Sequence, residues 1–310
     1  SGDTVVVARN GEFGGRMQEN DDRCGARTIT VDDEWGQPVD PDKVEDALRA
    51  HPEARVLAFV HAETSTGARS DAQALCALAT KYDCLSIVDT VTSLGGIDVD
   101  VDGWGVDAAY SGTQKCLSCV PGLSPVTFGE RAVARIRARR QKAQSWFLDL
   151  DLVMGYWGGE QRAYHHTAPI NALYALHEAL LILHEEGLEN AWQRHALHHR
   201  ALAAGLEALG MSFVVAPEWR LPQLNSVRIP SGLNDADVRR RLLDEYSLEI
   251  GAGLGPFAGR VWRIGLMGHA CRHDNVMLCL RALGRLVADA NPAVDAAAGL
   301  DAADNVYTAD

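Results

Sequence analysis

Short apolar runs alternate with helical patterns through the first two-thirds of the chain. The apolar runs predict buried strands at 4–8, 55–61, 85–89, 108–111 and 125–128. Apolar residues at helical spacing predict helices between them, at 44–50 and 72–82. Strands that alternate with helices are typical of an α/β layer fold with a mostly parallel sheet. The continuous apolar run Val-Leu-Ala-Phe-Val favours a sheet that is covered on both faces.

The pattern changes after two long helical segments, 169–186 and 188–209. Strands are expected at 212–215, 226–229 and 260–264, and helices at 235–246 and 272–287. This predicts a large domain at 1–186 and a smaller α+β domain at 187–290. Residues 291–310 are rich in Ala and Asp, which predicts a disordered tail. His195, His198 and His199 are expected on a solvated helix face.

Bulk composition limits the classes of partner. Hydrophobic residues make up 47% of the 310 residues, enough for a sizeable core, and the net charge is −13. That charge disfavours nucleic acid and anionic membranes. No apolar run approaches the ~20 residues of a membrane span, and no signal-peptide pattern opens the sequence. Seven irregularly spaced cysteines favour a cytoplasmic location, or an organelle matrix, over an oxidising one.

Lys115 and Asp89 are the most informative residues. Only four of the 29 Lys and Arg residues are lysine, and Lys115 lies among small, uncharged neighbours. A lysine amine forms a Schiff base with an aldehyde, and a carboxylate at a strand end keeps a pyridine nitrogen protonated. This pair therefore predicts pyridoxal 5'-phosphate (PLP) chemistry. Cys116 and Cys119 form a C-x-x-C without a second ligand pair, so no metal site is expected.

Three polar segments follow predicted strands, and parallel-sheet proteins bind ligands at the carboxyl ends of their strands. These segments contain small residues and hydroxyls that suit a phosphate or phenolate oxygen. They are His-Ala-Glu-Thr-Ser-Thr-Gly at 61–67, Asp-Thr-Val-Thr-Ser-Leu-Gly-Gly at 89–96 and Ser-Gly-Thr-Gln-Lys at 111–115. The sequence therefore predicts that Asp89 and Lys115 meet at one sheet edge.

With these segments, the chain resembles the class V, fold type I PLP-dependent aminotransferases, in their alanine–glyoxylate and serine–glyoxylate (serine–pyruvate) branch. The resemblance covers about residues 2–287. Further segments that carry it are Asn-Gly-Glu-Phe-Gly-Gly-Arg (10–16), Tyr-His-His-Thr-Ala-Pro (164–169), Gly-Leu-Glu-Asn (187–190) and Trp-Arg-Ile-Gly-Leu-Met-Gly (262–268). It implies a PLP-binding large domain followed by a smaller α+β domain.

The resemblance also implies roles for residues around the cofactor ring. Lys115 would form the Schiff base and shuttle the substrate proton, and Asp89 would pair with the pyridinium nitrogen. Thr64 would bond the ring hydroxyl. Phe13 would stack on one ring face and Val91 would pack against the other.

Four more roles concern anionic groups. By the same resemblance, Gln114 would help hold the phosphate. Tyr164 and Thr167 would reach the phosphate of a neighbouring subunit, which implies a homodimer with shared active sites. Arg263 would bind the substrate carboxylate, which suits its bidentate guanidinium.

Simpler interpretations of these residues stay open. Asp89 could be a helix N-cap, Thr64 an ordinary turn hydroxyl and Arg263 a surface strand residue. Tyr164 and Thr167 could serve local packing.

The predicted reaction is transfer of an amino group from alanine or serine to glyoxylate or pyruvate. A class V transaminase of another substrate, aminoethylphosphonate or pyridoxamine with pyruvate, is the alternative. Cysteine desulfurase is disfavoured, because no cysteine lies in a suitable loop after Lys115.

Members of this family begin well before the segment that matches Gly2. Judged against a full two-domain length, roughly ninety residues are expected before it. We therefore expect the parent protein to be active and this chain to bind PLP weakly or to be inactive. A catalytically silent PLP-fold remnant is a third hypothesis.

Overall fold

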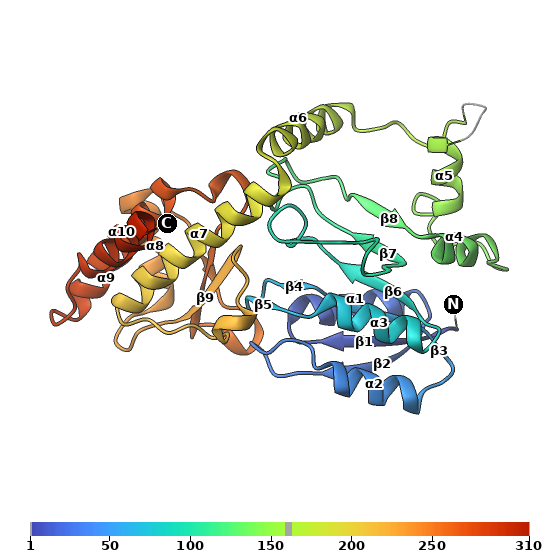
Figure 1. Cartoon of the computed structure of the whole chain (residues 1–310), viewed down its shortest axis with the longest axis horizontal. Helices are drawn as coiled ribbons and strands as arrows, with labels where there is room; N and C mark the ends of the chain where they lie inside the picture. The colour runs from blue at the N-terminus through green and yellow to red at the C-terminus, as the bar shows by residue number, and fades with distance from the viewer. Residues whose placement is uncertain (1, 159–162, 310) are drawn as a thin grey trace.

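The computed structural model describes residues 2–158 and 163–309 (Figure 1). Its main sheet has six strands in the order β2-β1-β3-β6-β7-β8. The first five run parallel to one another, and β8 pairs antiparallel with β7. The strands are β1 (Thr4–Arg9), β2 (Arg27–Asp32), β3 (Ala54–Val60), β6 (Leu85–Asp89), β7 (Ala108–Tyr110) and β8 (Val126–Phe128). The mostly parallel α/β architecture predicted from the pattern is confirmed.

Both faces of this sheet are covered by helices. Because successive side chains of a strand point to opposite faces, neighbouring residues of β1 belong to different apolar clusters. Val5 and Val7 of β1 pack in a cluster with Met17 of helix α1 (Glu12–Arg23). Val6 belongs instead to a larger cluster with Val44. That cluster includes the apolar sides of α2 (Pro41–Ala50) and α3 (Ala72–Lys81).

The C-terminal part has its own antiparallel sheet, β10-β11-β9, and its own apolar cluster. Trp262, completely buried on β11, lies in that cluster. The elements are α7 (Leu188–Ala208), β9 (Leu224–Arg228), α8 (Asp235–Tyr246), β10 (Gly251–Ala252), β11 (Val261–Gly265), α9 (His273–Ala290) and α10 (Ala298–Ala309), with short 3-10 turns at Pro217–Trp219, Gly255–Phe257 and Gly268–Ala270. The domain division at residues 186 and 187 stays a prediction, and the separate clusters support it.

Three helices come between these parts in the sequence: α4 (Glu130–Arg137), α5 (Leu150–Gly158) and α6 (Ile170–Glu186). Helix α6 runs above the rest of the fold in Figure 1, and none of its residues is buried. A two-stranded hairpin of β4 (Ala62–Glu63) and β5 (Ala68–Arg69) follows β3 and bears on the site described below. No helix in the described ranges combines the length and the apolar character that crossing a bilayer requires.

The prediction of a disordered tail is wrong for residues 298–309, which form α10. Small residues allow this helix to pack closely on α7: a Cβ on Gly205 would lie 2.7 Å from the carbonyl oxygen of Gly299. Ala303 is completely buried. The tail is ordered because alanine favours helix, glycine permits close contact, and Leu300, Val306 and Tyr307 pack against the C-terminal apolar cluster.

The same packing overturns the expectation for the histidines of α7. His195 is completely buried and His198 nearly so. The Nδ1 of His198 hydrogen-bonds the Tyr307 hydroxyl of α10 at 2.8 Å. His199 is half-buried, with its Nδ1 2.6 Å from the side-chain oxygen of Asn225. His195 Nε2 accepts a hydrogen bond from the Gly268 N–H at 3.0 Å. The rings stay out of solvent because this segment, α10 and β9 cover a helix face that looks polar in sequence.

Other local predictions also failed. Residues 212–215 form no strand, only an isolated bridge from Phe213 to Val227. Helix α1 and strand β2 were not predicted. Gly14 and Gly15 lower the helix propensity of α1, yet Gly14 has a packing purpose. A Cβ on Gly14 would lie 3.0 Å from the Cα of Arg9, so glycine lets α1 approach β1.

Candidate active site

The carboxyl ends of β3, β6 and β7 lie side by side and set up the site. Val60 pairs with Asp89, and Asp89 pairs with Tyr110, in parallel register. The Thr90 N–H continues this pairing to the Tyr110 carbonyl oxygen at 2.9 Å. The chain then leaves each strand in a loop, and these loops carry Thr64, Val91 and Lys115.

A cavity of about 300 Å³ opens at this edge. Six of the nine predicted site residues line it: Phe13, Thr64, Asp89, Val91, Gln114 and Lys115. The amine and the carboxylate that are separated in sequence therefore share one cavity. The other lining residues are Arg16, Met17, Asn20, Val60, Ala62, Thr92 and Tyr110.

Asp89 is buried and held at both oxygens. Its Oδ1 accepts a hydrogen bond from the Val91 N–H at 2.8 Å, and its Oδ2 accepts one from the Tyr110 hydroxyl at 2.8 Å. Burial raises the pKa of Asp89, whereas these two donors and the charge of Lys115 oppose the rise. A cation bound against this carboxylate would favour its ionised form. The arrangement does not match a helix N-cap, because Asp89 precedes turns rather than a helix.

Lys115 has no ion-pair or hydrogen-bond partner for its amine among the described residues. Burial lowers the pKa of Lys115, and the positive charge of Arg263 lowers it further. Each effect disfavours the ammonium form, which cannot act as a nucleophile. The other lysines with shifted values behave oppositely: ion pairs raise the pKa of Lys43 and Lys81. Lys115 is thus prepared for attack on a carbonyl carbon.

Arg263 comes from β11 and is held by backbone oxygens. Its Nε donates to the Ala252 carbonyl at 2.7 Å, and its Nη1 donates to the Thr64 carbonyl at 3.1 Å. No carboxylate forms an ion pair with it in the described ranges. The half-buried guanidinium therefore keeps hydrogen-bond donors for an external anion. Arg263 is not among the residues that line the cavity, but its bond to the carbonyl of Thr64, which does line it, places the guanidinium beside the site.

Tyr164 and Thr167 are not among the residues that line this cavity. Tyr164 is 76% exposed, and its hydroxyl contacts the Thr167 Oγ1 at 2.8 Å. Their predicted reach toward a neighbouring subunit stays a prediction.

Two polar residues of the site were not predicted from the sequence. Tyr110 was noted only as part of a strand, although its hydroxyl bonds Asp89. Glu63 belongs to the segment 61–67, but no role was predicted for it, and it is a completely buried carboxylate beside the cavity wall. A polar residue at the carboxyl end of a predicted central strand was the available signal for Tyr110.

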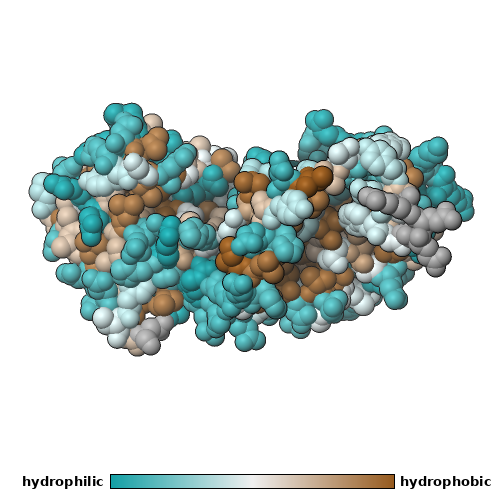
Figure 2. Space-filling view, turned by 90° about the horizontal axis from the view of Figure 1, so that it is seen from above, coloured by the Kyte–Doolittle hydropathy of each residue, from teal (hydrophilic) through white to brown (hydrophobic). Residues whose placement is uncertain are grey.

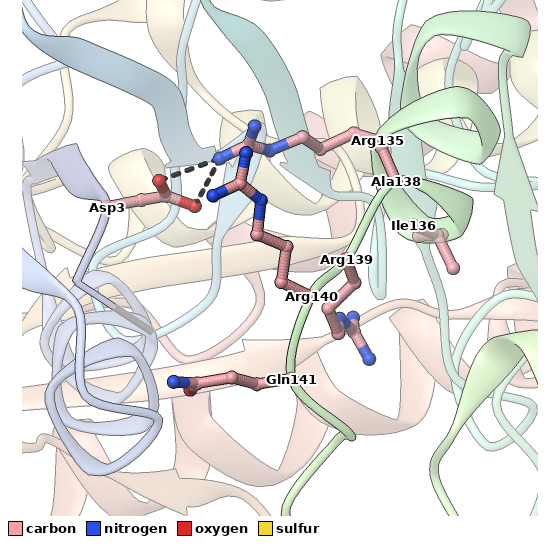
Figure 3. Close-up of a pocket in the computed structure, with 7 residues that line it drawn as sticks. All are labelled: Asp3, Arg135, Ile136, Ala138, Arg139, Arg140 and Gln141. Atoms are coloured by element: carbon pink, nitrogen blue, oxygen red, sulfur yellow. Dashed lines mark hydrogen bonds and ion pairs between the residues drawn. The ribbon is translucent and has the colours of Figure 1, made fainter.

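A cavity of about 550 Å³ elsewhere contains none of the predicted site residues (Figure 3). It is lined by arginines at the end of α4 and just beyond, with Asp3 opposite. Arg135 pairs with both oxygens of Asp3, at 2.7 and 2.8 Å. Arginines at a helix C-terminus suit the helix dipole, which accounts for this cluster without a ligand.

Comparisons with known proteins agree with this geometry. The family model for class V aminotransferases matches residues 1–270. The chain belongs to the class V aminotransferase family. It is therefore a PLP-dependent aminotransferase, and the enzyme class and cofactor predicted from the sequence are confirmed.

Three known proteins are similar to this chain. The (S)-ureidoglycine–glyoxylate transaminase of Bacillus subtilis is 37% identical, over 98% of this chain and 77% of the relative. The structure of an alanine–glyoxylate aminotransferase from Nostoc sp. is 46% identical, with a TM-score of 0.90, over 92% of this chain and 75% of that one. A pyridoxamine–pyruvate aminotransferase from Mesorhizobium loti is 28% identical, with a TM-score of 0.92, over 99% and 78%.

The residues at the cavity fit PLP. A partnerless amine suits the cofactor aldehyde, and a buried carboxylate suits a protonated ring nitrogen. Apolar lining atoms from Phe13 and Val91 suit the faces of an aromatic ring. When bound, the cofactor supplies an electron sink for the carbanion that forms at the substrate carbon.

Proposed function

We propose that this class V aminotransferase moves an amino group between a small amino acid and glyoxylate or pyruvate. The observation that carries the proposal is that the free amine of Lys115 and the buried carboxylate of Asp89 line one cavity. The Arg263 guanidinium bonds the carbonyl oxygen of Thr64, which lines the same cavity.

Each of these three residues would have a distinct role. Lys115 Nζ would bond the cofactor aldehyde carbon and, once displaced by the substrate amine, carry a proton to and from the substrate carbon. Asp89 would hold the proton on the ring nitrogen. Arg263 would grip the substrate carboxylate with the donors that Thr64 and Ala252 leave free.

Relatives support glyoxylate as the acceptor. Two of the three similar proteins named above carry glyoxylate in their names, and these have the higher identities. Pyridoxamine with pyruvate is the second candidate, supported by the M. loti protein at 28% identity. Alanine or serine is the proposed donor, because the cavity of about 300 Å³ must hold both cofactor and substrate.

Two experiments test the proposal. Borohydride reduction of the PLP-loaded chain followed by peptide mapping should place a pyridoxyl group on Lys115, and a Lys115→Ala variant should carry none. Profiling of amino donors against glyoxylate and pyruvate should then give turnover with small amino acids. Absence of label on Lys115 in a PLP-saturated sample would favour the silent remnant.

A homodimer with shared sites is part of the proposal. Apolar side chains gather near the middle of the face seen from above in Figure 2, the side on which α6 lies in Figure 1. Large apolar residues exposed on α5, α6 and the segments beside them include Trp146, Trp157, Leu173, Tyr174 and Ile182. Patches of this kind mark protein interfaces.

Mixing two inactive variants tests the shared site. A Lys115→Ala chain and a chain with Tyr164→Ala and Thr167→Ala should each show little activity alone. Hybrid dimers should regain activity, because one of their two sites has every group intact. No gain on mixing, with hybrids verified by native mass spectrometry, would contradict the shared site.

A cytoplasmic or organelle-matrix location is also proposed. All seven cysteines are free thiols, which suits a reducing compartment.

A further inference from the structure

Glu63 is a completely buried carboxylate with four hydrogen-bond donors around it. Its Oε2 accepts from the backbone N–H groups of Phe13 at 3.1 Å and Gly14 at 3.2 Å. Its Oε1 accepts from the N–H of Ser65 at 3.0 Å and from the Ser65 hydroxyl at 2.6 Å. Burial raises the pKa of Glu63, whereas these four hydrogen bonds oppose the rise and favour the ionised form.

These bonds replace a cap that α1 lacks. Gly11 is the N-cap residue of α1 and has no side chain to bond the free N–H groups at the helix start. The Glu12 N–H donates instead to the Ser65 Oγ at 2.9 Å. A Cβ on Gly11 would lie 2.5 Å from the Glu63 Cδ, so only glycine lets the hairpin approach this closely. The first three N–H groups of α1 are thus bonded by a distant segment.

Helix α1 forms one wall of the cofactor cavity. Phe13, Arg16, Met17 and Asn20 line the cavity, and their spacing puts them on one helix face. The Arg16 guanidinium lies 5.0 Å from the centroid of the Phe13 ring. A shift of the first turn of α1 would therefore move the proposed stacking ring directly.

We propose that Glu63 is a positioning residue that holds the ring of Phe13 against the cofactor by anchoring the start of α1. This inference rests on the stacking role proposed for Phe13. Glu63 does not line the cavity, so it acts through the backbone of Phe13 and Gly14 and not by contact with the ligand. Burial lowers the pKa of Arg263, and the charge of Glu63 opposes that shift.

The Glu63→Gln variant tests this at nearly constant volume. An amide presents only one acceptor oxygen. Its NH₂ group therefore faces either the two N–H groups of α1 or the N–H and hydroxyl groups of Ser65. We expect the dissociation constant of PLP to rise about tenfold, which is about 1.4 kcal/mol, because buried donors lose their acceptor. The visible circular dichroism of the bound cofactor should change as well, because it reports how the ring is held.

Asp71→Ala is the matched control. Asp71 caps α3, where its Oδ1 accepts from the Ala74 N–H at 2.9 Å, and it does not line the cavity. This variant loses a helix-capping carboxylate as Glu63→Gln does, and its Tm should fall. Its PLP affinity and circular dichroism should match the wild type. Equal losses of Tm with wild-type PLP binding in both variants would overturn the inference and leave Glu63 a purely structural cap.

A double-mutant cycle with Phe13→Ala separates action through Phe13 from any other route. If Glu63 acts through the ring, adding Glu63→Gln to Phe13→Ala should raise the PLP dissociation constant by less than about threefold. Full additivity would overturn the inference.

Ser65→Ala is a second variant in case Glu63→Gln does not fold. It removes one donor to Glu63 and the acceptor for the Glu12 N–H, so it should weaken PLP binding in the same direction, by about threefold, and show the same dependence on Phe13. A Ser65→Ala variant with unchanged PLP affinity and circular dichroism would contradict the inference. Failure of wild-type protein to carry PLP on Lys115 would instead refute the proposed function.

Discussion

The Tyr110 hydroxyl donates a hydrogen bond to Asp89 Oδ2 at 2.8 Å, from the strand that lies next to the end of β6. Burial raises the pKa of Tyr110, and the Asp89 carboxylate raises it further, so the phenol stays protonated and remains a donor. The same bond favours the ionised form of Asp89 against the effect of burial. Tyr110 thus helps to maintain the charge that we propose Asp89 presents to the PLP ring nitrogen.

Tyr110→Phe should lower activity through Asp89. Loss of the donor raises the pKa of Asp89, so the acid limb of kcat/KM against pH should move to higher pH. At neutral pH we expect a loss of about tenfold, since a hydrogen bond to a charged group contributes about 1.5–3 kcal/mol. Tyr82→Phe is the control: its hydroxyl bonds Glu45 at 2.8 Å, away from the cavity. An unshifted acid limb in Tyr110→Phe would contradict this role.

The reactivity of Lys115 should depend on Arg263. In the PLP-free chain, Lys115 should react with an amine-selective reagent at lower pH than Lys43 and Lys81, whose pKa values are raised by ion pairs. Arg263→Met removes a like charge, so the pKa of Lys115 should rise and the midpoint of its reaction rate should move to higher pH. Peptide mass spectrometry over a pH series measures the rate at which each lysine is labelled by the reagent.

Arg220→Met provides the comparison for that experiment, because Arg220 pairs with Glu207 at 3.0 Å and does not line the cavity. The Lys115 midpoint should be the same in Arg220→Met as in the wild type. Equal midpoints in the wild type and Arg263→Met would show that the two charges do not interact.

Arg263→Met should also impair substrates that carry a carboxylate. Losing a charge-assisted contact of about 1.5–3 kcal/mol predicts a fall in kcat/KM for glyoxylate of about 10- to 150-fold. An aldehyde acceptor without a carboxylate should be affected far less. Steady-state kinetics with both acceptors make the comparison, and equal losses for the two would argue that Arg263 supports structure rather than substrate.

Gly205→Ala should weaken the packing of α10 on α7. Its Cβ would lie 2.7 Å from the Gly299 carbonyl, and overpacking of this kind costs about 1–3 kcal/mol. Gly155→Ala on α5 is the control, because no atom lies within 4 Å of a Cβ there. Helix propensity predicts a gain of up to about 1 kcal/mol for it. Urea unfolding measures the free energy of unfolding of both variants. A Gly205→Ala variant as stable as the wild type would exclude the close contact.

Much of the parallel sheet could be predicted from local pattern. The strand ending at Asp89 and the helix at Asp235–Tyr246 have the bounds that the pattern predicts. Helix α1 could not be found that way, because Gly11 gives it no cap of its own and its N-terminal N–H groups are bonded by Glu63 and Ser65, about fifty residues away. Helix α10 was missed because its few apolar residues pack on a distant core, and two glycines let it approach α7 closely.

The amino-acid sequence alone determined which groups we propose for the chemistry. Lys115, Asp89 and Arg263 can be picked out because the functional group of each side chain, an amine, a carboxylate or a guanidinium, is given by the residue type itself. Only the tertiary structure decided the state in which each group is held. The lowered pKa of Lys115, the donor on Asp89 and the anchor beneath Phe13 all come from neighbours on other segments. Burial and hydrogen bonding act across space, and no spacing along the chain encodes them directly.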